Sequence, residues 1–349
     1  MEDQTPKPMR RLRYAGTHPK SFKEKYKELQ PEKYADDIAK VIQQGRTPAG
    51  MHRSICVGEI MEFLKIVPGQ IGMDATLGYG GHSLEMLKCL APGGRLYAID
   101  VDPFELTRTR DRLASFGFGP DVIVIKKMNF SEINQIVAEV GTLNFVLADL
   151  GVSSMQIDNP ERGFSFKVEG PLDLRLNPKS GKSAAALLKT ISQHKLEEIL
   201  LENSDEPYYK SIANAIISKI AKGMVINTTT QLKEIIAEAL EFLPPSNRKD
   251  EITKSCQRSF QALRIEVNDE LGALDQFLEK LPSSLSAGGR VAILSFHSGE
   301  DRLVKKSFQR LFQAGIYSEV APDPIRPSAK ECNANPRASS AKLRWAVKA

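Results

Sequence analysis

Two acidic residues flank a glycine-rich segment in the first third of the chain. Asp74 is followed by Gly78, Gly80 and Gly81, and Asp100 comes 22 residues after Gly78. Glycine permits unusual backbone dihedral angles and lets a ligand approach the main chain closely. A carboxylate at the end of the following strand can accept hydrogen bonds from both hydroxyls of a ribose. These residues predict a site for a nucleoside.

The spacing of these residues distinguishes between nucleoside cofactors. A dinucleotide fingerprint needs Gly-x-Gly-x-x-Gly, with the pyrophosphate at a helix N-terminus. Here the acid Asp74 precedes the glycines, where it would repel a pyrophosphate but suit the ammonium group of a methionine moiety. S-adenosylmethionine is therefore the predicted cofactor. Taken alone, the glycines could equally form a turn between packed elements, and Asp100 at the expected offset favours the binding site.

The elements that would position these residues alternate along the chain. Apolar runs predict strands that end at Asp74 and Asp100, followed by strands over 122–125 and 143–149. Helical patterns separate them, at 57–64, 83–90, 103–116 and 131–140. This alternation predicts an α/β fold with a Rossmann-like, parallel, doubly wound sheet, whose ligands lie at the carboxyl ends of the strands. Phe130 and Asp149 fall at such ends too.

The alternation stops after Asp149 for about a hundred residues. A loop over 151–181 precedes helical patterns, which cover 184–188, 194–202, 208–221 and 230–240. Beyond a Pro-Pro linker at 244–249, we expect one long helix, a strand, a helix and a last strand, at 259–281, 288–295, 300–313 and 341–347. The predicted domains are an extension over 1–50, a sheet domain over 51–160 and 255–349, and a loop plus helical insertion over 161–254.

Charge is unevenly distributed over the 349 residues. The net charge is +5, and residues 1–50 hold 11 Lys or Arg against 7 Asp or Glu. Residues 326–349 hold 6 against 1. The extension also interleaves basic and aromatic residues, as in Arg10-Arg11-Leu12-Arg13-Tyr14. Two basic ends indicate a polyanion such as RNA as partner, because phosphate contacts supply sequence-independent affinity. The alternatives are a solvated surface and an arm that packs on the body.

Composition also bears on compartment and metal content. No apolar run approaches the length of about 18 residues that a membrane-spanning helix needs. The four cysteines lie far apart, which predicts neither a metal site nor a disulfide framework. The N-terminus has no signal-peptide core and carries acids that transit peptides lack. We expect a cytoplasmic protein that binds neither membrane nor metal.

The segment after Asp149 carries the residues best suited to chemistry on a base. It begins Asp149-Leu-Gly-Val-Ser-Ser154. Farther along, Phe164 and Phe166 could hold a flipped base, and Arg162 or Arg175 could hold phosphate. The two rings could instead anchor the loop on the core. His297, at the end of another predicted strand, is a candidate substrate contact, although a single His there is more often structural.

An ordered set of motifs resembles one family, the MraW methyltransferases of bacteria. The matching segments span residues 52–345 and are Asp74-Ala-Thr-Leu-Gly-Tyr-Gly-Gly-His-Ser83, Ala98-Ile-Asp-Val-Asp102, Asp149-Leu-Gly-Val-Ser-Ser154, Glu161-Arg-Gly-Phe-Ser-Phe166, Gly170-Pro-Leu-Asp173, Ser259-Phe-Gln-Ala-Leu-Arg-Ile265, Ser295-Phe-His-Ser298, Glu300-Asp-Arg302, Asn335-Pro-Arg337 and Ala341-Lys-Leu-Arg344. Such enzymes methylate the exocyclic N4 of a cytosine in small-subunit ribosomal RNA, using S-adenosylmethionine.

The resemblance implies a class I S-adenosylmethionine-dependent methyltransferase sheet with a helical insertion. It also implies which residues line the cofactor site, namely Gly80, Gly81, His82, Asp100, Phe130, Asp149 and Gln156. Its implied partner is ribosomal RNA within the small subunit, with the oligomeric state open between monomer and homodimer. Departures such as His52-Arg-Ser-Ile-Cys56, Ser339 and the basic extension leave room for a divergent paralogue with another target nucleotide.

A cytosine N4 amine is a poor nucleophile because its lone pair is delocalised into the ring. We expect Asp149, Ser153 or Ser154 to accept hydrogen bonds from the amine and so assist its attack. Many amine methyltransferases use a Pro-Pro-aromatic loop here, which this chain lacks. Two rivals remain: a small-molecule methyltransferase or oxidoreductase on the same sheet, and a non-catalytic ribosome-assembly factor that binds RNA.

Overall fold

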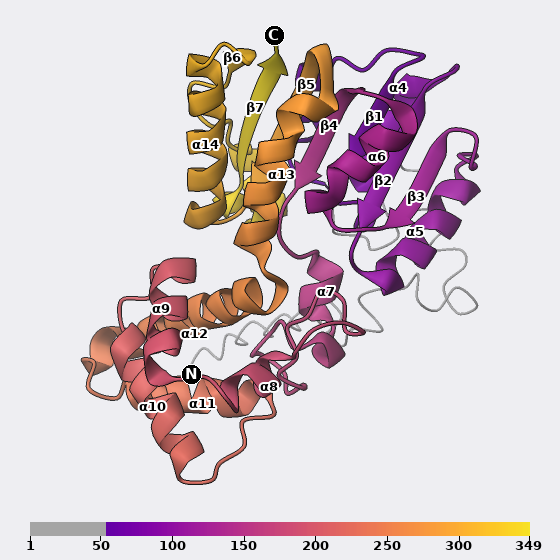
Figure 1. The fold of residues 1–349 in the computed structure, drawn as a ribbon. Coiled ribbons are helices and arrows are strands. Elements are labelled where there is room, and N and C mark those ends of the chain that lie inside the picture. The colour runs from indigo at the N-terminus through magenta and orange to yellow at the C-terminus, as the bar shows by residue number, and fades with distance from the viewer. Residues whose placement is uncertain (1–53) are drawn as a thin grey trace, which may run out of the picture. The chain divides into compact units, whose positions relative to one another are not determined.

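A seven-stranded sheet organises the part of the chain that the computed structural model describes, residues 54–349 (Figure 1). The predicted basic extension lies outside these residues. The strands follow the order β3-β2-β1-β4-β5-β7-β6 across the sheet. Their bounds are β1 Ile71–Asp74, β2 Arg95–Asp100, β3 Ile123–Lys127, β4 Leu143–Asp149, β5 Leu285–Ser295, β6 Tyr317–Val320 and β7 Lys342–Lys348.

The first five strands are parallel, as the alternation of strands and helices predicts. β7 pairs antiparallel with β5, and β6 pairs antiparallel with β7. The sheet is therefore mixed rather than wholly parallel, and β6 is a strand that the sequence patterns miss. The strand order changes direction between β1 and β4, which is where ligands bind in open α/β sheets. Asp74 and Asp149 end these two strands.

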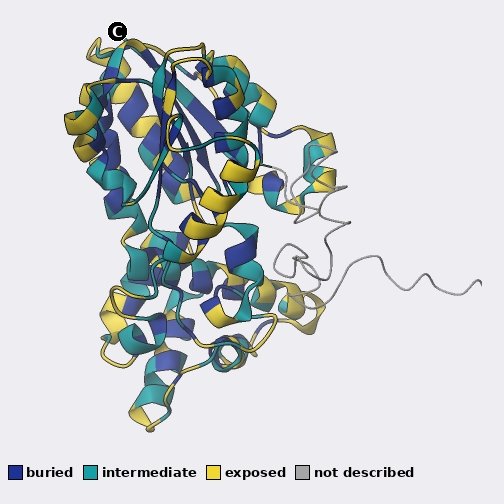
Figure 2. Ribbon diagram, turned by 90° about the vertical axis from the view of Figure 1, so that its right-hand side faces the viewer, coloured by how far each residue is buried: buried dark blue, intermediate teal, exposed yellow. Residues whose placement is uncertain are grey.

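Helices cover both faces of the sheet, so the central strands are buried (Figure 2). The helices are α3 Val57–Leu64, α4 Gly81–Leu90, α5 Pro103–Ser115, α6 Ile133–Val140, α13 Glu270–Ser284 and α14 Ser298–Gln313. Side chains alternate between the faces along a strand. In β4, Val146 packs in a cluster with α6, α13 and α14. Phe145 and Leu147 pack with α3, α4 and α5.

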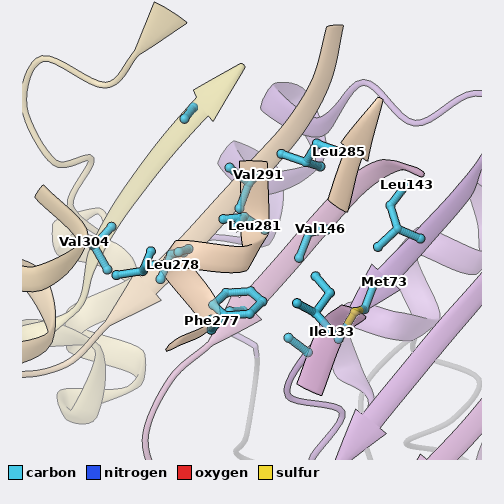
Figure 3. Close-up of a cluster of buried hydrophobic side chains, with 14 of the residues drawn as sticks. Met73, Ile133, Leu143, Val146, Phe277, Leu278, Leu281, Leu285, Val291 and Val304 are labelled. Carbon is cyan, nitrogen blue, oxygen red and sulfur yellow. The ribbon is translucent and has the colours of Figure 1, made fainter. Parts of the chain in front are cut away.

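Figure 3 shows how the first of these clusters joins distant parts of the chain. Phe277, Leu278 and Leu281 project from α13 onto the sheet, where Met73 and Val146 meet them. All five side chains are at most 2% exposed. Burying apolar side chains of this size stabilises a fold by roughly 1.5–3 kcal/mol each. This packing fixes β1 and β4, and hence the ends of the strands at the switch point.

Between β4 and β5 the chain forms a helical insertion. Its helices are α8 Ala184–Leu188, α9 Gln193–Ser204, α10 Tyr209–Ala221, α11 Thr229–Ala239 and α12 Pro245–Asn268. These helices share a hydrophobic cluster of their own, separate from the two clusters on the sheet. The domain limits given above stay a prediction. The predicted linker at 244–249 is wrong, because Pro245 begins α12; proline suits the first turn of a helix, where its missing N–H costs nothing.

The single long helix predicted over 259–281 is also wrong. Asp269 adopts a left-handed conformation, with φ of 48°, which ends α12 and begins α13. The predicted loop at 151–181 contains two short helices, α7 Ser154–Asp158 and η3 Pro160–Arg162. Before β7 lie α15 Ala329–Ala334 and η4 Pro336–Ser340, which the sequence patterns also miss. Within residues 54–349, no helix is long and apolar enough to cross a membrane.

Candidate active site

The glycine turn after β1 is held by the acid at the end of β2. The backbone N–H of Gly78 donates to Asp100 Oδ2 at 2.7 Å, and the N–H of Asp102 donates to Asp100 Oδ1 at 2.9 Å. Gly78 has φ of 46°, a conformation that favours glycine. The two residues that predict the nucleoside site thus lie in direct contact. Each oxygen of Asp100 retains lone-pair capacity for a ribose hydroxyl.

Burial changes the acidity of Asp100. It raises the pKa of this carboxyl to about 6, although the N–H groups of Asp102 and Gly78 oppose the shift by stabilising the charged form. Two hydroxyl donors from a ribose would stabilise the charge further. The site is therefore better suited to a neutral diol than to an anion.

Asp74 lies deeper than the sequence suggests. Its side chain is 2% exposed, and its oxygens accept from Ser83 Oγ at 2.6 Å and from the N–H of Thr76 at 3.1 Å. Burial is the main cause that raises the pKa of this carboxyl. In these contacts Asp74 ties the start of α4 to the end of β1. Its contact with an ammonium group stays a prediction.

Close packing explains why the next residues are glycines. Gly80 has φ of 72°, and an added Cβ would lie 2.6 Å from Thr109 Cγ2. A Cβ on Gly81 would collide with the Ser54 hydroxyl. Thr109 also donates to the carbonyl of Gly78 at 2.6 Å. The turn is thus clamped between α5 and the segment before α3, which fixes its backbone at the N-terminus of α4.

His82 and Asp149 face each other at the switch point. His82 Nε2 lies 3.5 Å from Asp149 Oδ2, and the histidine is 7% exposed. Among the described residues, neither His82 Nε2 nor Asp149 Oδ1 has a hydrogen-bond partner, although both atoms are buried. Burial lowers the pKa of His82, but the Asp149 carboxylate outweighs it and raises the value overall. Unpaired buried polar atoms are costly, so these two mark a place where a ligand group fits.

Phe130 and Gln156, which the resemblance assigns to the cofactor site, follow the ends of β3 and β4. Phe130 begins η2, Phe130–Glu132, just after β3, and packs edge-on against Phe277 with ring centroids 5.3 Å apart. Gln156 lies in α7 after β4 and is 7% exposed. Its amide donates to Asp102 Oδ2 at 2.8 Å. Together with Asp74, Asp100 and Asp149, they lie at the carboxyl ends of four strands.

The candidate catalytic residues have different local roles. The Ser153 hydroxyl accepts from the N–H of Gln156 at 3.2 Å and caps α7, while Gln156 Oε1 accepts from the N–H of Ser153 at 2.8 Å. This reciprocal capping box uses the Ser153 hydroxyl oxygen as an acceptor. Ser154 is the first residue of α7 and is partly exposed. The backbone N–H of Asp149 donates to Thr76 Oγ1 at 2.6 Å, which joins the ends of β4 and β1. Their catalytic roles stay predictions.

Both candidate base-stacking rings pack inside the helical insertion. Phe164 is 9% exposed and belongs to the insertion's hydrophobic cluster. Phe166 packs against the same cluster, with its ring centroid 5.4 Å from that of Phe260. These contacts favour the alternative role, in which the rings anchor the long loop on the core. A base-stacking role is still a prediction for both residues.

The basic candidates are engaged within the protein. Arg162 is 7% exposed and pairs with Asp102, so it is not the free phosphate ligand considered above. Arg175 donates through Nε and Nη2 to the two oxygens of Asp173, at 2.7 and 2.8 Å, and it remains partly exposed. His297 caps α14, and its Nε2 lies 3.2 Å from Glu300 Oε1. Phosphate or RNA contacts of Arg175 and His297 stay predictions.

Two residues of this site lie inside the family motifs, but sequence reading assigns them no role. Asp102, at 0% exposure, caps α5 and accepts from both Gln156 and Arg162. An Asp before Pro at a helix start is a capping signal that sequence reading can detect, although its long-range partners cannot be foreseen. Thr76 is a single hydroxyl inside the glycine-rich motif, and no pattern marks its contact with Asp149. No group of three or more His, Cys, Asp or Glu within residues 54–349 is placed to hold a metal ion.

Comparison with known proteins gives a consistent result. The family model described as the MraW methylase family matches residues 49–349. "Ribosomal RNA small subunit methyltransferase H 2" of Alkaliphilus metalliredigens is 70% identical over 349 residues, which covers all of both chains. "Ribosomal RNA small subunit methyltransferase H 1" of Lachnoclostridium phytofermentans is 65% identical, covering 100% of this chain and 95% of that one.

More distant matches differ in length and in identity. The Acidobacterium capsulatum relative is 37% identical and covers 85% of this chain but 98% of its own. The crystal structure of an rRNA methylase from Streptococcus thermophilus is 12% identical, with a TM-score of 0.40, and covers 84% of this chain and 97% of that chain. Because the family model covers all of the described residues and the relatives match along nearly their full length, this chain belongs to the MraW methylase family.

Proposed function

We propose that this protein is an S-adenosylmethionine-dependent methyltransferase that methylates the N4 amine of a cytosine in small-subunit ribosomal RNA. The observation that carries the choice of RNA is the 70% identity, over the whole of both chains, with a relative named as a small-subunit ribosomal RNA methyltransferase. Membership of a methylase family supports the reaction. The N4 position rests on the resemblance of the motifs around Asp149 and Phe164.

The described residues fit S-adenosylmethionine. Asp100 has free acceptor capacity beside the glycine turn, which suits a ribose. His82 Nε2 and Asp149 Oδ1 have no hydrogen-bond partner among the described residues, and their side chains face each other at the switch point, where a sulfonium ligand and an amine would both find partners. When bound, the cofactor supplies an electrophilic methyl group on a positively charged sulfur. The residues that would hold the cofactor are Asp74, Gly78, Gly80, Gly81, His82, Asp100, Phe130, Asp149 and Gln156.

Asp149 is the residue best placed to act on the incoming amine. Its side chain is 29% exposed, so the carboxylate can meet a substrate N–H, while its buried Oδ1 has no hydrogen-bond partner among the described residues. An accepted hydrogen bond orients the amine lone pair and favours pyramidal nitrogen. Methyl transfer to this nitrogen would leave it positively charged, so it must then lose one proton.

Asp149 gives that proton a place to go. Its partly exposed carboxylate accepts the proton from the amine and can then release it to solvent. The Asp149 carboxylate raises the pKa of His82, so the imidazolium 3.5 Å away stabilises the negative charge before transfer. Ser153 caps α7 through its hydroxyl oxygen but can still donate its hydrogen, and Ser154 is partly exposed. Either serine can complete the hydrogen bonding of the exocyclic amine or ring nitrogen.

Two observations bear on which nucleotide is methylated, namely the basic extension and the numbers in the names of the relatives. Relatives that are 52–70% identical cover 97–100% of this chain, and their names carry a number, 1 or 2. Relatives at 37–40% identity cover only 85–89% of it, and their names carry none. This division supports the alternative of a paralogue with a different target nucleotide.

The proposal also includes a cytoplasmic location for the protein and action on assembled small subunits.

Methyl transfer to defined substrates tests the proposal. Small subunits and naked small-subunit RNA from a deletion strain are incubated with the protein and tritiated S-adenosylmethionine, and mass spectrometry then maps the modified nucleotide. We expect one N4-methylcytosine in wild-type cells that is absent from the deletion strain. Asp149→Asn should abolish incorporation while S-adenosylhomocysteine binding persists. Incorporation at another nucleotide would establish the paralogue, and no incorporation with any ribosomal substrate would favour the assembly-factor alternative.

A further inference from the structure

A buried ion pair joins the cofactor half of the site to the loop that follows β4. Arg162 Nη1 donates to Asp102 Oδ2 at 2.6 Å, and the two residues are 7% and 0% exposed. Asp102 lies two residues beyond the ribose acid Asp100, whereas Arg162 ends η3. Gln156 provides a second link by donating to the same Asp102 oxygen at 2.8 Å.

Each end of this pair is fixed to a different ligand-bearing segment. The N–H of Asp102 donates to Asp100 Oδ1 at 2.9 Å, so a displacement of Asp100 is passed to Asp102. At the other end, Arg162 Nη2 donates to the carbonyls of Arg175 and Leu176, at 3.1 and 2.8 Å. One guanidinium therefore bridges the turn after β2 and residues 170–176. Only arginine offers this planar fork of donors, which a lysine cannot reproduce.

We infer that Asp102 and Arg162 are positioning residues that couple cofactor binding to the order of the substrate loop, residues 170–176. The inference rests on the proposed function, in which Asp100 binds the cofactor. A ligand that fixes Asp100 also fixes Asp102, and through Arg162 it holds the backbone of residues 175 and 176. The loop is then ordered before RNA arrives, so RNA binding loses less conformational entropy. By linkage, RNA and cofactor raise each other's affinity, by about 5- to 150-fold in typical coupled systems.

The contacts around Arg162 favour a role in linking Asp102 to residues 170–176 over a purely local structural role. The N–H of Leu174 donates to the carbonyl of Arg162 at 3.3 Å, and the N–H of Leu176 donates to Asn268 Oδ1 at 2.7 Å. Asn268 is the last residue of α12. Residues 170–176 are thus held by Arg162, by α12 and by the insertion, where the N–H of Leu172 donates to the carbonyl of Asn227 at 2.8 Å. Loss of the guanidinium removes the link to Asp102 and leaves the other attachments.

Hydrogen exchange with S-adenosylhomocysteine as the only ligand tests this coupling. In the wild-type protein, saturating ligand should slow exchange at residues 76–83 and 100–104 and also, at least several-fold, at residues 170–176. In Arg162→Met the ligand should still protect the first two segments but no longer the third. This variant leaves Asp102 buried without its counter-charge, which destabilises the folded protein. Arg162→Lys therefore serves as a second variant, because it retains the charge but not the fork.

A matched control is Arg258→Met. Arg258 Nε donates to Glu206 Oε2 at 2.7 Å in an ion pair within the insertion, where Glu206 is 0% exposed. This variant should lose stability yet retain ligand-induced protection of residues 170–176. Protection that persists in both Arg162 variants, or is missing from a wild-type protein that binds the ligand, would overturn the inference alone. Failure of the wild-type protein to bind S-adenosylhomocysteine in titration calorimetry would overturn the proposed function and this inference together.

Discussion

His82 Nε2 lies 3.5 Å from Asp149 Oδ2, so an imidazole from the start of α4 faces a carboxylate from the end of β4. The two side chains come from either side of the position where the strand order reverses. They differ in exposure, because the histidine is buried and the aspartate is 29% exposed. Substrate can therefore reach the carboxylate, while the imidazole supports it from within the protein.

This pairing predicts the effect of replacing the histidine. His82→Ala should lower the single-turnover rate of methyl transfer by about 10²-fold, the lower range for a lost acid–base group. The reason is that Asp149 would lose the neighbour that stabilises its charge. Rapid-quench measurements with tritiated cofactor would give the rate, and calorimetry would give S-adenosylhomocysteine affinity. A loss confined to cofactor affinity, with the single-turnover rate intact at saturation, would exclude a role in proton transfer.

The pKa of Asp100 predicts how cofactor affinity depends on pH. Burial raises this pKa to about 6, and ribose hydroxyls need the ionised carboxylate as acceptor. Affinity for S-adenosylhomocysteine should be constant above pH 7 and fall by about tenfold per pH unit well below 6, because binding must then release a proton. Calorimetry in buffers with different ionisation enthalpies would count the released protons.

Two variants isolate Asp100 in that experiment. Asp100→Asn should bind weakly at every pH with no proton release. Glu105→Gln removes a second buried carboxyl, whose pKa burial raises to about 7, and should keep the decline centred near 6. A decline that moves or disappears in the Glu105 variant would assign the titration to that residue instead.

Adding a side chain at Gly72 should create a packing defect within the sheet. A Cβ at this position would collide with the ring of Phe145, the residue of β4 that pairs with Gly72 and is 0% exposed. Gly72→Ala should therefore destabilise the protein by about 1–3 kcal/mol, the usual cost of overpacking. Urea unfolding would measure the change. Gly58→Ala is the control, since nothing lies within 4 Å of an added Cβ there, and stability should stay the same or rise by up to about 1 kcal/mol.

The packing of Phe164 predicts that its substitution acts mainly on stability. Phe164→Leu should lower the free energy of unfolding by about 1 kcal/mol, because a buried ring of the insertion's cluster is lost. Its RNA affinity, measured by filter binding, should change less than twofold. Phe242→Leu is an exposed counterpart, at 66% exposure, and should alter neither quantity. A large loss of RNA affinity with normal stability would restore the base-stacking role for Phe164.

The basic extension predicts a salt-dependent contribution to RNA binding. Residues 1–50 carry 11 Lys or Arg, and phosphate contacts release counterions. Deleting them should weaken binding to small-subunit RNA and reduce the slope of log affinity against log salt concentration. Affinity for S-adenosylhomocysteine should not change. An unaltered salt slope would assign the extension a packing role on the rest of the protein.

The elements that sequence patterns predict well are those with strong local signals. The runs that end at Asp74, Asp100 and Asp149 are continuous and apolar, as expected for buried parallel strands, and all three end as predicted. The break at Asp269 is invisible to periodicity, because the apolar spacing continues across it and only a left-handed backbone conformation ends the helix. β6 is four residues long and gains its stability by pairing with β7. Such tertiary pairing leaves little local signal.

The same distinction applies to the site. The contact between Gly78 and Asp100 follows from parallel strands whose ends meet at one edge. The pair of Arg162 and Asp102 joins residues 60 apart in sequence, and no spacing rule connects them. The packing of Phe164 inside the insertion likewise depends on helices that come later in the chain. Residue type can indicate what a side chain is able to do, but long-range partners decide which of those roles remains open.

The place where the helical insertion joins the sheet also bears on how this family can diversify. The chain leaves the sheet after Asp149, forms the insertion, and rejoins it through α13. The strands β1 and β2 and the glycine turn belong to neither junction. Mutations in the insertion can therefore accumulate without disturbing the half that contains Asp100. After a gene duplication, one copy can acquire a new target site while it keeps the same cofactor-binding half. Asp102 and Arg162 join the two halves, so a substitution at either residue would affect both.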